Sequence, residues 1–204
     1  MKVLEKIFFV IIFGAVLPIT FFLAGWWGTV GLVEENKIFI FAISGLAIGI
    51  VLDFFLLKKI ISDLYEISNS TLVLVYIFYS ICCFGFFMGV PIFNSMLGIP
   101  AGYYAAKKCI YLKKETDYAE KYFKQTAFFT SVIITLISIA SATIALMDPY
   151  TAKGLKDMLN LSFDLTKFRL VTVIILGGSI LITFQYFLTR YTTKIIYRIF
   201  TKQV

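Results

Sequence analysis

The chain has 204 residues, of which 60% are hydrophobic and only 15% are charged, whereas soluble domains carry about 25% charged residues. The mean hydropathy is +0.90, and the charges gather in short blocks between long apolar runs, which excludes an ordinary water-soluble domain. There is no histidine, which excludes histidine-based catalysis, proton relays and metal sites. The net charge of +7 is typical of a membrane protein with basic cytoplasmic loops, so we expect no binding to nucleic acid.

Six apolar runs follow one another along the chain, and each is long enough to be a membrane segment. They cover residues 7–27, 38–57, 69–88, 91–108, 126–147 and 170–189. The first run could instead be a cleaved signal peptide, but Trp26 and Trp27 near its end are typical of an interfacial belt. We therefore predict an all-α polytopic integral membrane protein, a single transmembrane domain that forms a bundle of six segments.

The middle of the chain determines the predicted topology. Residues 67–106 form a run of 40 positions without a single Asp, Glu, Lys or Arg. One helix of that length would measure about 60 Å, twice the thickness of the hydrocarbon core. We therefore expect the chain to turn back between Gly89 and Pro91. The fourth segment then begins with Pro91 and is short or kinked at Pro100, and it either crosses the membrane fully or is re-entrant.

The distribution of basic residues favours this turn. With six crossings and both termini inside, 14 of the 19 basic residues lie on the cytoplasmic side. With five crossings, eight would lie inside and eleven outside, against the positive-inside rule. We therefore predict cytoplasmic N- and C-termini. The compact size and short loops suggest a prokaryotic plasma membrane.

Three segments outside the membrane have amphipathic patterns. In the outer connection 148–169, Leu155, Met158 and Leu159 are at helical spacing and predict a short surface helix. Residues 113–124 are expected to form a short helix on the inner surface. The tail 190–204 is predicted to be a basic amphipathic helix along the anionic inner leaflet, because its basic residues are spaced four apart. These are Arg190, Lys194, Arg198 and Lys202.

Asp53 is the one acidic residue inside a predicted membrane segment. Gly45, Gly49 and Asp53 are spaced by four, so they share one helix face, and the two glycines form a small-residue packing pattern. That face would pack inside the bundle and carry the acid with it, which makes Asp53 a candidate binding residue. The alternative is that Asp53 lies near the cytoplasmic interface and pairs with Lys58.

The stretch from residue 89 to residue 104 is the second candidate site. Broken helices free backbone amide and carbonyl groups, which transporters use to hold ions and substrates. We therefore predict substrate binding by Asn94 and by the backbone around Pro91, Gly98 and Pro100, with Asp53 as charge partner. The alternative is a tight outer turn followed by a kinked helix that packs through Gly98 and Gly102.

Small and hydroxyl-bearing residues also recur in the last two segments, where they either line a polar path or form helix contacts, with Gly177 and Gly178 as packing positions. The three cysteines have neither disulfide nor zinc spacing, and we predict no metal, no cofactor and no catalytic residue. The best prediction is a small transporter or the substrate-binding membrane subunit of one. The alternative is an accessory or assembly protein that acts through helix contacts with a protein partner or a second copy. In both cases the lipid bilayer surrounds the chain.

Overall fold

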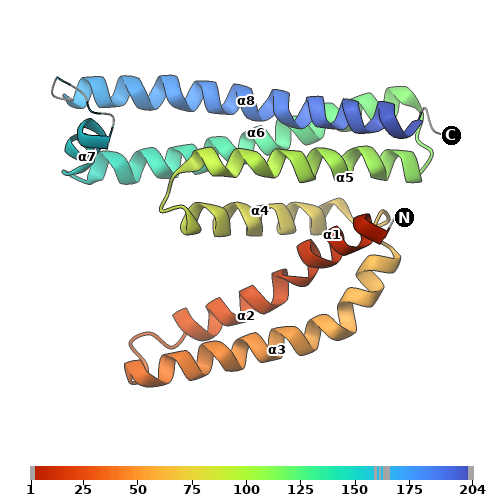
Figure 1. The fold of residues 1–204 in the computed structure, drawn as a ribbon, viewed down its shortest axis with the longest axis horizontal. Coiled ribbons are helices and arrows are strands. Elements are labelled where there is room, and N and C mark those ends of the chain that lie inside the picture. Colours follow the sequence, from red (N-terminus) through yellow and green to blue (C-terminus); the bar gives the residue numbers. More distant parts are fainter. Residues whose placement is uncertain (1–2, 159, 161, 163–165, 202–204) are drawn as a thin grey trace. The chain divides into compact units, whose positions relative to one another are not determined.

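The computed structural model describes residues 3–158, 160, 162 and 166–201, and within these residues it is all helical, without strands (Figure 1). Five helical stretches are long and apolar enough to cross a membrane, which agrees with the predicted all-α membrane protein. They are Glu5–Trp27, Glu35–Ser62, Asn69–Phe86, Thr116–Met147 and Lys167–Thr201.

Two compact units make up the chain, unit 1 (Met1–Val75) and unit 2 (Tyr76–Val204), and each is described by itself. The boundary between them falls inside α4 (Asn69–Phe86). How the units assemble in the bilayer into a single transmembrane domain stays a prediction.

Unit 1 begins with two short helices, α1 (Val3–Gly14) and α2 (Val16–Trp27), where the sequence predicts one segment over residues 7–27. The break lies at Gly14–Ala15. Pro18 explains it, because proline has no backbone N–H and cannot donate the helical hydrogen bond to the carbonyl of Gly14. Hydropathy runs unchanged through the break, so the apolar pattern alone does not reveal it.

The long helix α3 (Glu35–Ser62) packs against α2 through glycine. A Cβ built at Gly45 would overlap the carbonyl oxygen of Phe21, and one at Gly49 would lie 2.6 Å from the Cα of Pro18. The two helix backbones therefore lie in direct contact, as small residues permit in membrane helices. At the other end of α3, the hydroxyl of Tyr65 donates a hydrogen bond of 2.5 Å to the buried Glu5.

Unit 2 starts with the remainder of α4 and a turn that the sequence places at Gly89. Met88 and Gly89 have positive φ angles of 54° and 81°, and the N–H of Gly89 donates to the carbonyl of Phe84 at 2.8 Å, which ends α4. The chain continues as the 3₁₀-helix η1 (Pro91–Leu97) and the α-helix α5 (Gly98–Tyr111). Pro100 lies in the first turn of α5, where its missing N–H disrupts no hydrogen bond. The expected kink is therefore a change of helix type at Gly98.

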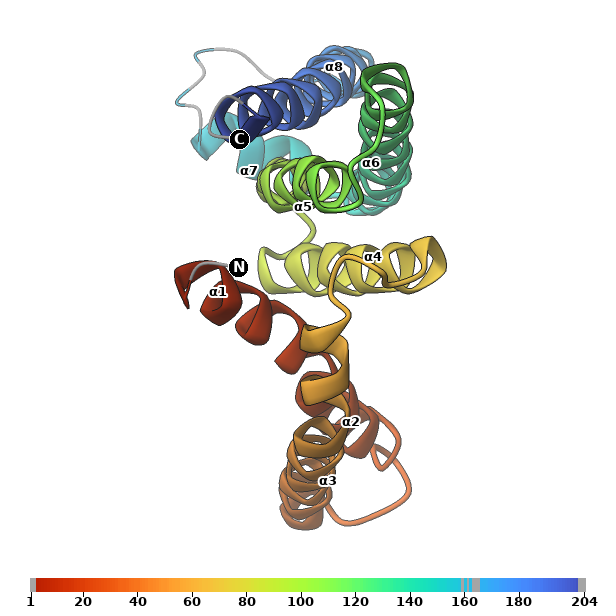
Figure 2. The ribbon, with the colours of Figure 1, turned by 90° about the vertical axis from the view of Figure 1, so that its right-hand side faces the viewer.

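Three helices form the body of unit 2: α5, α6 (Thr116–Met147) and α8 (Lys167–Thr201), which lie side by side in both ribbon views (Figures 1 and 2). With 32 and 35 residues, α6 and α8 measure about 48 and 52 Å, longer than the hydrocarbon core of about 30 Å. Residues 113–124 do not form the separate short helix that we predicted, because α6 already begins at Thr116. The tail likewise continues α8 as far as Thr201, and Lys202 lies outside the described residues.

The charged turns at this end of unit 2 are joined by ion pairs. The carboxylate of Glu120 on α6 lies 3.0 Å from Nη2 of Arg190 and 3.3 Å from Nζ of Lys194, both on α8. Beside them, Cys109 and Phe123 belong to a small apolar core between α5 and α6. Specific contacts therefore hold the basic tail against α6.

The connection between α6 and α8 contains a further helix, α7 (Thr151–Met158), where the sequence predicts a short surface helix. Its start is capped by Asp148, whose carboxylate accepts hydrogen bonds from the N–H of Tyr150 at 3.0 Å and from the hydroxyl of Thr151 at 2.8 Å. Leu159, the last residue of the predicted apolar face, lies outside the described residues.

Candidate functional site

Buried polar side chains concentrate in unit 2 where η1 and α5 meet α8. Gln185, Thr189 and Thr193, spaced by four along α8, are all fully buried. We refer to six residues from four elements as the polar cluster, because hydrogen bonds and close contacts connect them. They are Tyr76 and Ser80 on α4, Asn94 on η1, Thr130 on α6, and Gln185 and Thr189 on α8.

Gln185 is the centre of the polar cluster. Its Nε2 lies 3.3 Å from the hydroxyl of Tyr76 and 3.4 Å from the hydroxyl of Thr189, and it donates to both. The hydroxyl of Thr189 is in turn 3.0 Å from that of Thr130. This side of the cluster thus connects α4, α8 and α6.

Asn94 closes the cluster on its other side. Its Nδ2 donates a hydrogen bond of 2.7 Å to the backbone carbonyl of Ser80, and the Ser80 hydroxyl donates to the carbonyl of Tyr76 at 2.8 Å. Further along the same chain segment, a Cβ at Gly98 would lie 2.7 Å from Nε2 of Gln185. Contacts therefore run from Gln185 through Tyr76 and Ser80 to Asn94, and Gly98 of the same chain segment contacts Gln185.

Two acceptor atoms of the polar cluster have no partner among the described residues. Oδ1 of Asn94 and Oε1 of Gln185 are buried and form no hydrogen bond with any described residue. Leaving such a group unsatisfied costs about 1–3 kcal/mol, and this cost is expected at sites that bind something. The polar cluster therefore offers two amide oxygens to a hydrogen-bond donor or a cation.

Glycine positions α5 against this cluster. A Cβ at Gly98 would lie 2.6 Å from the hydroxyl oxygen of Thr189, and one at Gly102 would lie 2.8 Å from its carbonyl oxygen. Any larger residue would push α5 away from α8. The predicted packing role and the predicted binding role of Gly98 thus coincide at one contact.

The other predicted binding residues lie outside the polar cluster. Pro91 begins η1 and Pro100 lies in the first turn of α5, so both shape the backbone on which Asn94 is held. Asp53 belongs to unit 1 and is described with it. Our sequence reasoning considered Gln185 only as part of a possible polar path and gave Thr189 no role, although their spacing by four inside an apolar run is a signal that could have identified both.

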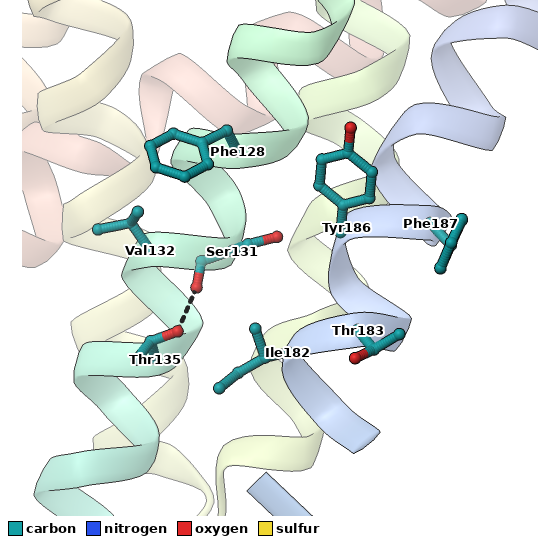
Figure 3. Close-up of a pocket in the computed structure, with 8 residues that line it drawn as sticks. All are labelled: Phe128, Ser131, Val132, Thr135, Ile182, Thr183, Tyr186 and Phe187. Atoms are coloured by element: carbon teal, nitrogen blue, oxygen red, sulfur yellow. Dashed lines mark hydrogen bonds between the residues drawn. The ribbon is translucent and has the colours of Figure 1, made fainter. Parts of the chain in front are cut away.

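A groove runs between α6 and α8 on another face of unit 2, with a volume of about 350 Å³ (Figure 3). Two of its hydroxyl groups bond to their own helices: that of Thr135 donates to the carbonyl of Ser131 at 2.7 Å (Figure 3), and that of Thr183 donates to the carbonyl of Ser179 at 2.8 Å. Four of the lining side chains are aromatic or β-branched hydrocarbon, namely Phe128, Val132, Ile182 and Phe187. The groove therefore presents carbon, which does not favour the polar path that we considered for these helices.

Gly177 and Gly178 on α8 have open space beside them. A Cβ at either position would meet no atom within 4 Å. Inside unit 2, Gly177 and Gly178 therefore do not make the close helix contact that Gly98 and Gly102 make.

In unit 1, Asp53 is 8% exposed and shares the buried face of α3 with Gly45 and Gly49. Its Oδ2 would lie 3.1 Å from a Cβ built at Gly14, next to the break between α1 and α2. Among the described residues Asp53 forms no hydrogen bond and no ion pair, so the pairing with Lys58 that we considered is not formed.

The three cysteines are free, and Cys109 is buried whereas Cys82 and Cys83 are partly buried. Within the described ranges, no group of three or more His, Cys, Asp or Glu residues is placed to hold a metal ion.

Comparison of the chain with models of protein families, with curated proteins and with solved structures finds no match.

Proposed function

We propose that this chain is a membrane transport protein, either a small transporter or the substrate-binding membrane subunit of one, with the polar cluster as its binding centre. The observation that carries the proposal is the pair of buried acceptors without partners, Oδ1 of Asn94 and Oε1 of Gln185. A cluster that only held helices together would be expected to satisfy these groups internally.

The backbone around the cluster supports the same proposal. Transporters commonly bind their substrates where a membrane segment is interrupted, because irregular backbone is tolerated there only when it lines a site. Here the 3₁₀-helix η1 changes into α5 at Gly98, the residue that contacts Gln185 and Thr189. The glycine contacts would also let α5 shift along α8 to admit and release a ligand.

The available groups define the class of ligand. Carboxamide and hydroxyl oxygens accept hydrogen bonds and bind hard cations, and no described member of the polar cluster carries a formal charge. We therefore expect a small ligand that is rich in hydrogen-bond donors, such as an ammonium compound or a polyol, or an alkali-metal ion.

The proposal includes six crossings with both termini in the cytoplasm of a prokaryotic cell. The α-helix α5 has 14 residues and is about 21 Å long, and the seven residues of η1 add about 14 Å. Together they would reach across a hydrocarbon core of about 30 Å. The basic residues would then gather on one side, as the positive-inside rule requires.

A thermal-shift screen of the purified protein in nanodiscs tests the binding centre, with ammonium compounds, polyols and alkali-metal salts as probes. A ligand at 100 times its Kd should stabilise the fold by about 2.7 kcal/mol. That shift should be lost in Gln185→Leu and Asn94→Leu, and kept in Thr183→Val, whose hydroxyl bonds only to its own helix. A ligand that stabilises all three variants as well as the wild type would place its binding elsewhere.

A second function, that of an accessory or assembly subunit, is favoured by the carbon-lined groove between α6 and α8 and by the open surface at Gly177 and Gly178. A transmembrane helix of another subunit would fit there, since small residues allow close helix approach. Isolation in mild detergent followed by mass spectrometry tests this function, and a monomer without a stoichiometric partner would contradict it.

A further inference from the structure

We propose that Asp53 binds a monovalent cation, a proton or an alkali-metal ion, inside the membrane-spanning part of α3 and beside the break between α1 and α2. This site belongs to unit 1 alone and goes beyond the proposed transport function, because it requires no ligand in the polar cluster.

The carboxyl group of Asp53 lies on the buried face of α3. Asp53 lies on the face of α3 that also carries Ala42, Gly45 and Gly49, and these are four of the five buried residues of that helix. Gly45 and Gly49 contact the backbone of α2 directly. The carboxyl group therefore faces the α1–α2 segment rather than lipid.

No described residue compensates the burial of the Asp53 carboxyl group. Among the described residues it accepts no hydrogen bond and forms no ion pair, although it is only 8% exposed. An ionised carboxylate with neither water nor a cation is strongly disfavoured in such a place. The group must therefore carry a proton or hold a cation.

The charged residues of the elements around it do not replace such a cation. The helix α2 contains no charged residue. On α1, Glu5 is bonded to Tyr65, and Lys6 is exposed two turns before Gly14. On α3 itself, the nearest basic residues are the exposed Lys58 and Lys59, which lie beyond the buried face.

The backbone carbonyl of Gly14, at the break between α1 and α2, is a second possible ligand near Asp53. Because Pro18 has no N–H, the carbonyl of Gly14 lacks its helical hydrogen bond. Gly14 lies close to the carboxylate, with Oδ2 3.1 Å from the position of its missing Cβ. A carboxylate and a carbonyl without its helical hydrogen bond are hard oxygen ligands, which suit a proton or an alkali-metal ion. Helix breaks supply ion ligands in this way in transporters.

The test uses the full chain reconstituted in liposomes and dicyclohexylcarbodiimide, a membrane-soluble reagent that modifies protonated carboxyl groups. Labelling of the peptide that contains Asp53 is followed by mass spectrometry from about pH 5 to about pH 9, with and without sodium chloride or potassium chloride. We expect Asp53 to be labelled several-fold faster at the acidic end. Loss of labelling when sodium or potassium is added at constant pH identifies an alkali-metal ion, and insensitivity to both salts identifies a proton.

Variants separate binding from folding. Asp53→Asn should abolish labelling of this peptide, and Glu35→Gln, at an exposed position of the same helix, should leave it unchanged. Pro18→Ala returns an N–H donor to the carbonyl of Gly14 and should shift the pH midpoint or weaken the protection by salt. Infrared difference spectra of wild type against Asp53→Asn provide an independent readout, since a protonated carboxyl group has its own C=O stretching band. The proposal is overturned if Asp53 shows neither labelling nor a carboxylic-acid band at any pH, and neither salt changes the spectrum.

Discussion

Replacing Gly98 by alanine tests the packing of the polar cluster more sharply than any other single change in unit 2. The added methyl group would lie 2.6 Å from the hydroxyl oxygen of Thr189 and 2.7 Å from Nε2 of Gln185. Both side chains are fully buried, so neither can swing away into solvent. Either α5 moves away from α8, or the cluster loses its hydrogen bonds.

The size of the effect follows from these contacts. Overpacking of a buried site costs about 1–3 kcal/mol, and loss of the hydrogen bond between Thr130 and Thr189 adds about 0.5–1.5 kcal/mol. Alanine returns up to about 1 kcal/mol of helix propensity, but less at Gly98 because this residue is the first of α5. We therefore expect a net destabilisation of about 2 kcal/mol. For a chain of this length, that lowers Tm by about 4–8 °C.

The assay is thermal unfolding of the purified protein in detergent, with Gly177→Ala as the matched control. Gly177 lies in the interior of α8, and a Cβ there meets no atom within 4 Å. The control therefore makes the same chemical change without a clash and should leave Tm equal or slightly raised. Equal Tm values for Gly98→Ala and Gly177→Ala would refute the close contact between α5 and α8.

Three further changes test other parts of the fold. Glu120→Gln removes the ion pair with Arg190, and because Glu120 is 40% exposed we expect a loss of only about 0.5 kcal/mol, seen as a small fall in Tm that high salt abolishes. Gly45→Ala forces a methyl group onto the backbone carbonyl of Phe21, so α2 and α3 must separate, with a cost of about 1–3 kcal/mol in the same assay; an unchanged Tm would contradict that contact. Backbone N–H and hydroxyl donors at the start of α7 lower the pKa of Asp148 below its ordinary 3.8, so its stabilisation of α7 is complete above that pH and is lost as pH falls through the lowered pKa. Hydrogen exchange in α7 should then speed up relative to the intrinsic rate as the pH falls below 3.8 in the wild type, and show no such pH dependence in the Asp148→Ala variant.

The features that sequence predicts well are those set by neighbours along the chain. Apolar runs predict the long helices, and the combination of Gly89 with Pro91 predicts the turn that ends α4. Spacing by four places Gly45, Gly49 and Asp53 on one face, which is the buried face of α3 in the structure. Each of these inferences needs only helix geometry and the special backbone of glycine and proline.

The break between α1 and α2 and the start of α6 were not predicted, for different reasons. Pro18 lies inside an unbroken apolar run, and hydropathy alone does not register the missing N–H of a proline. Residues 113–124 are highly charged, and such a block predicts a segment separate from the membrane-spanning helix. In the structure Thr116 begins a helix that simply continues beyond the length that the hydrocarbon core requires.

The polar cluster required tertiary structure. Tyr76 and Gln185 are 109 positions apart, and no local pattern relates them. Asn94 stood out in the sequence because it interrupts a Gly- and Pro-rich stretch, whereas its hydrogen bond to the carbonyl of Ser80 depends on how η1 folds back on α4. Sequence alone therefore identified Asn94 as a candidate binding residue and considered Gln185 only as part of a possible polar path.

The central claim is that the chain turns back at Gly89 and that η1 and α5 cross the membrane again, so that the polar cluster lies within the bilayer. Labelling of single cysteines by a membrane-impermeant maleimide, in a background without native cysteines, tests it most directly at Asn36 and Glu115. We predict that position 36 is labelled in intact cells and that position 115 is labelled only after the membrane is permeabilised. Labelling of position 115 from outside intact cells would contradict the second crossing and the binding centre that depends on it.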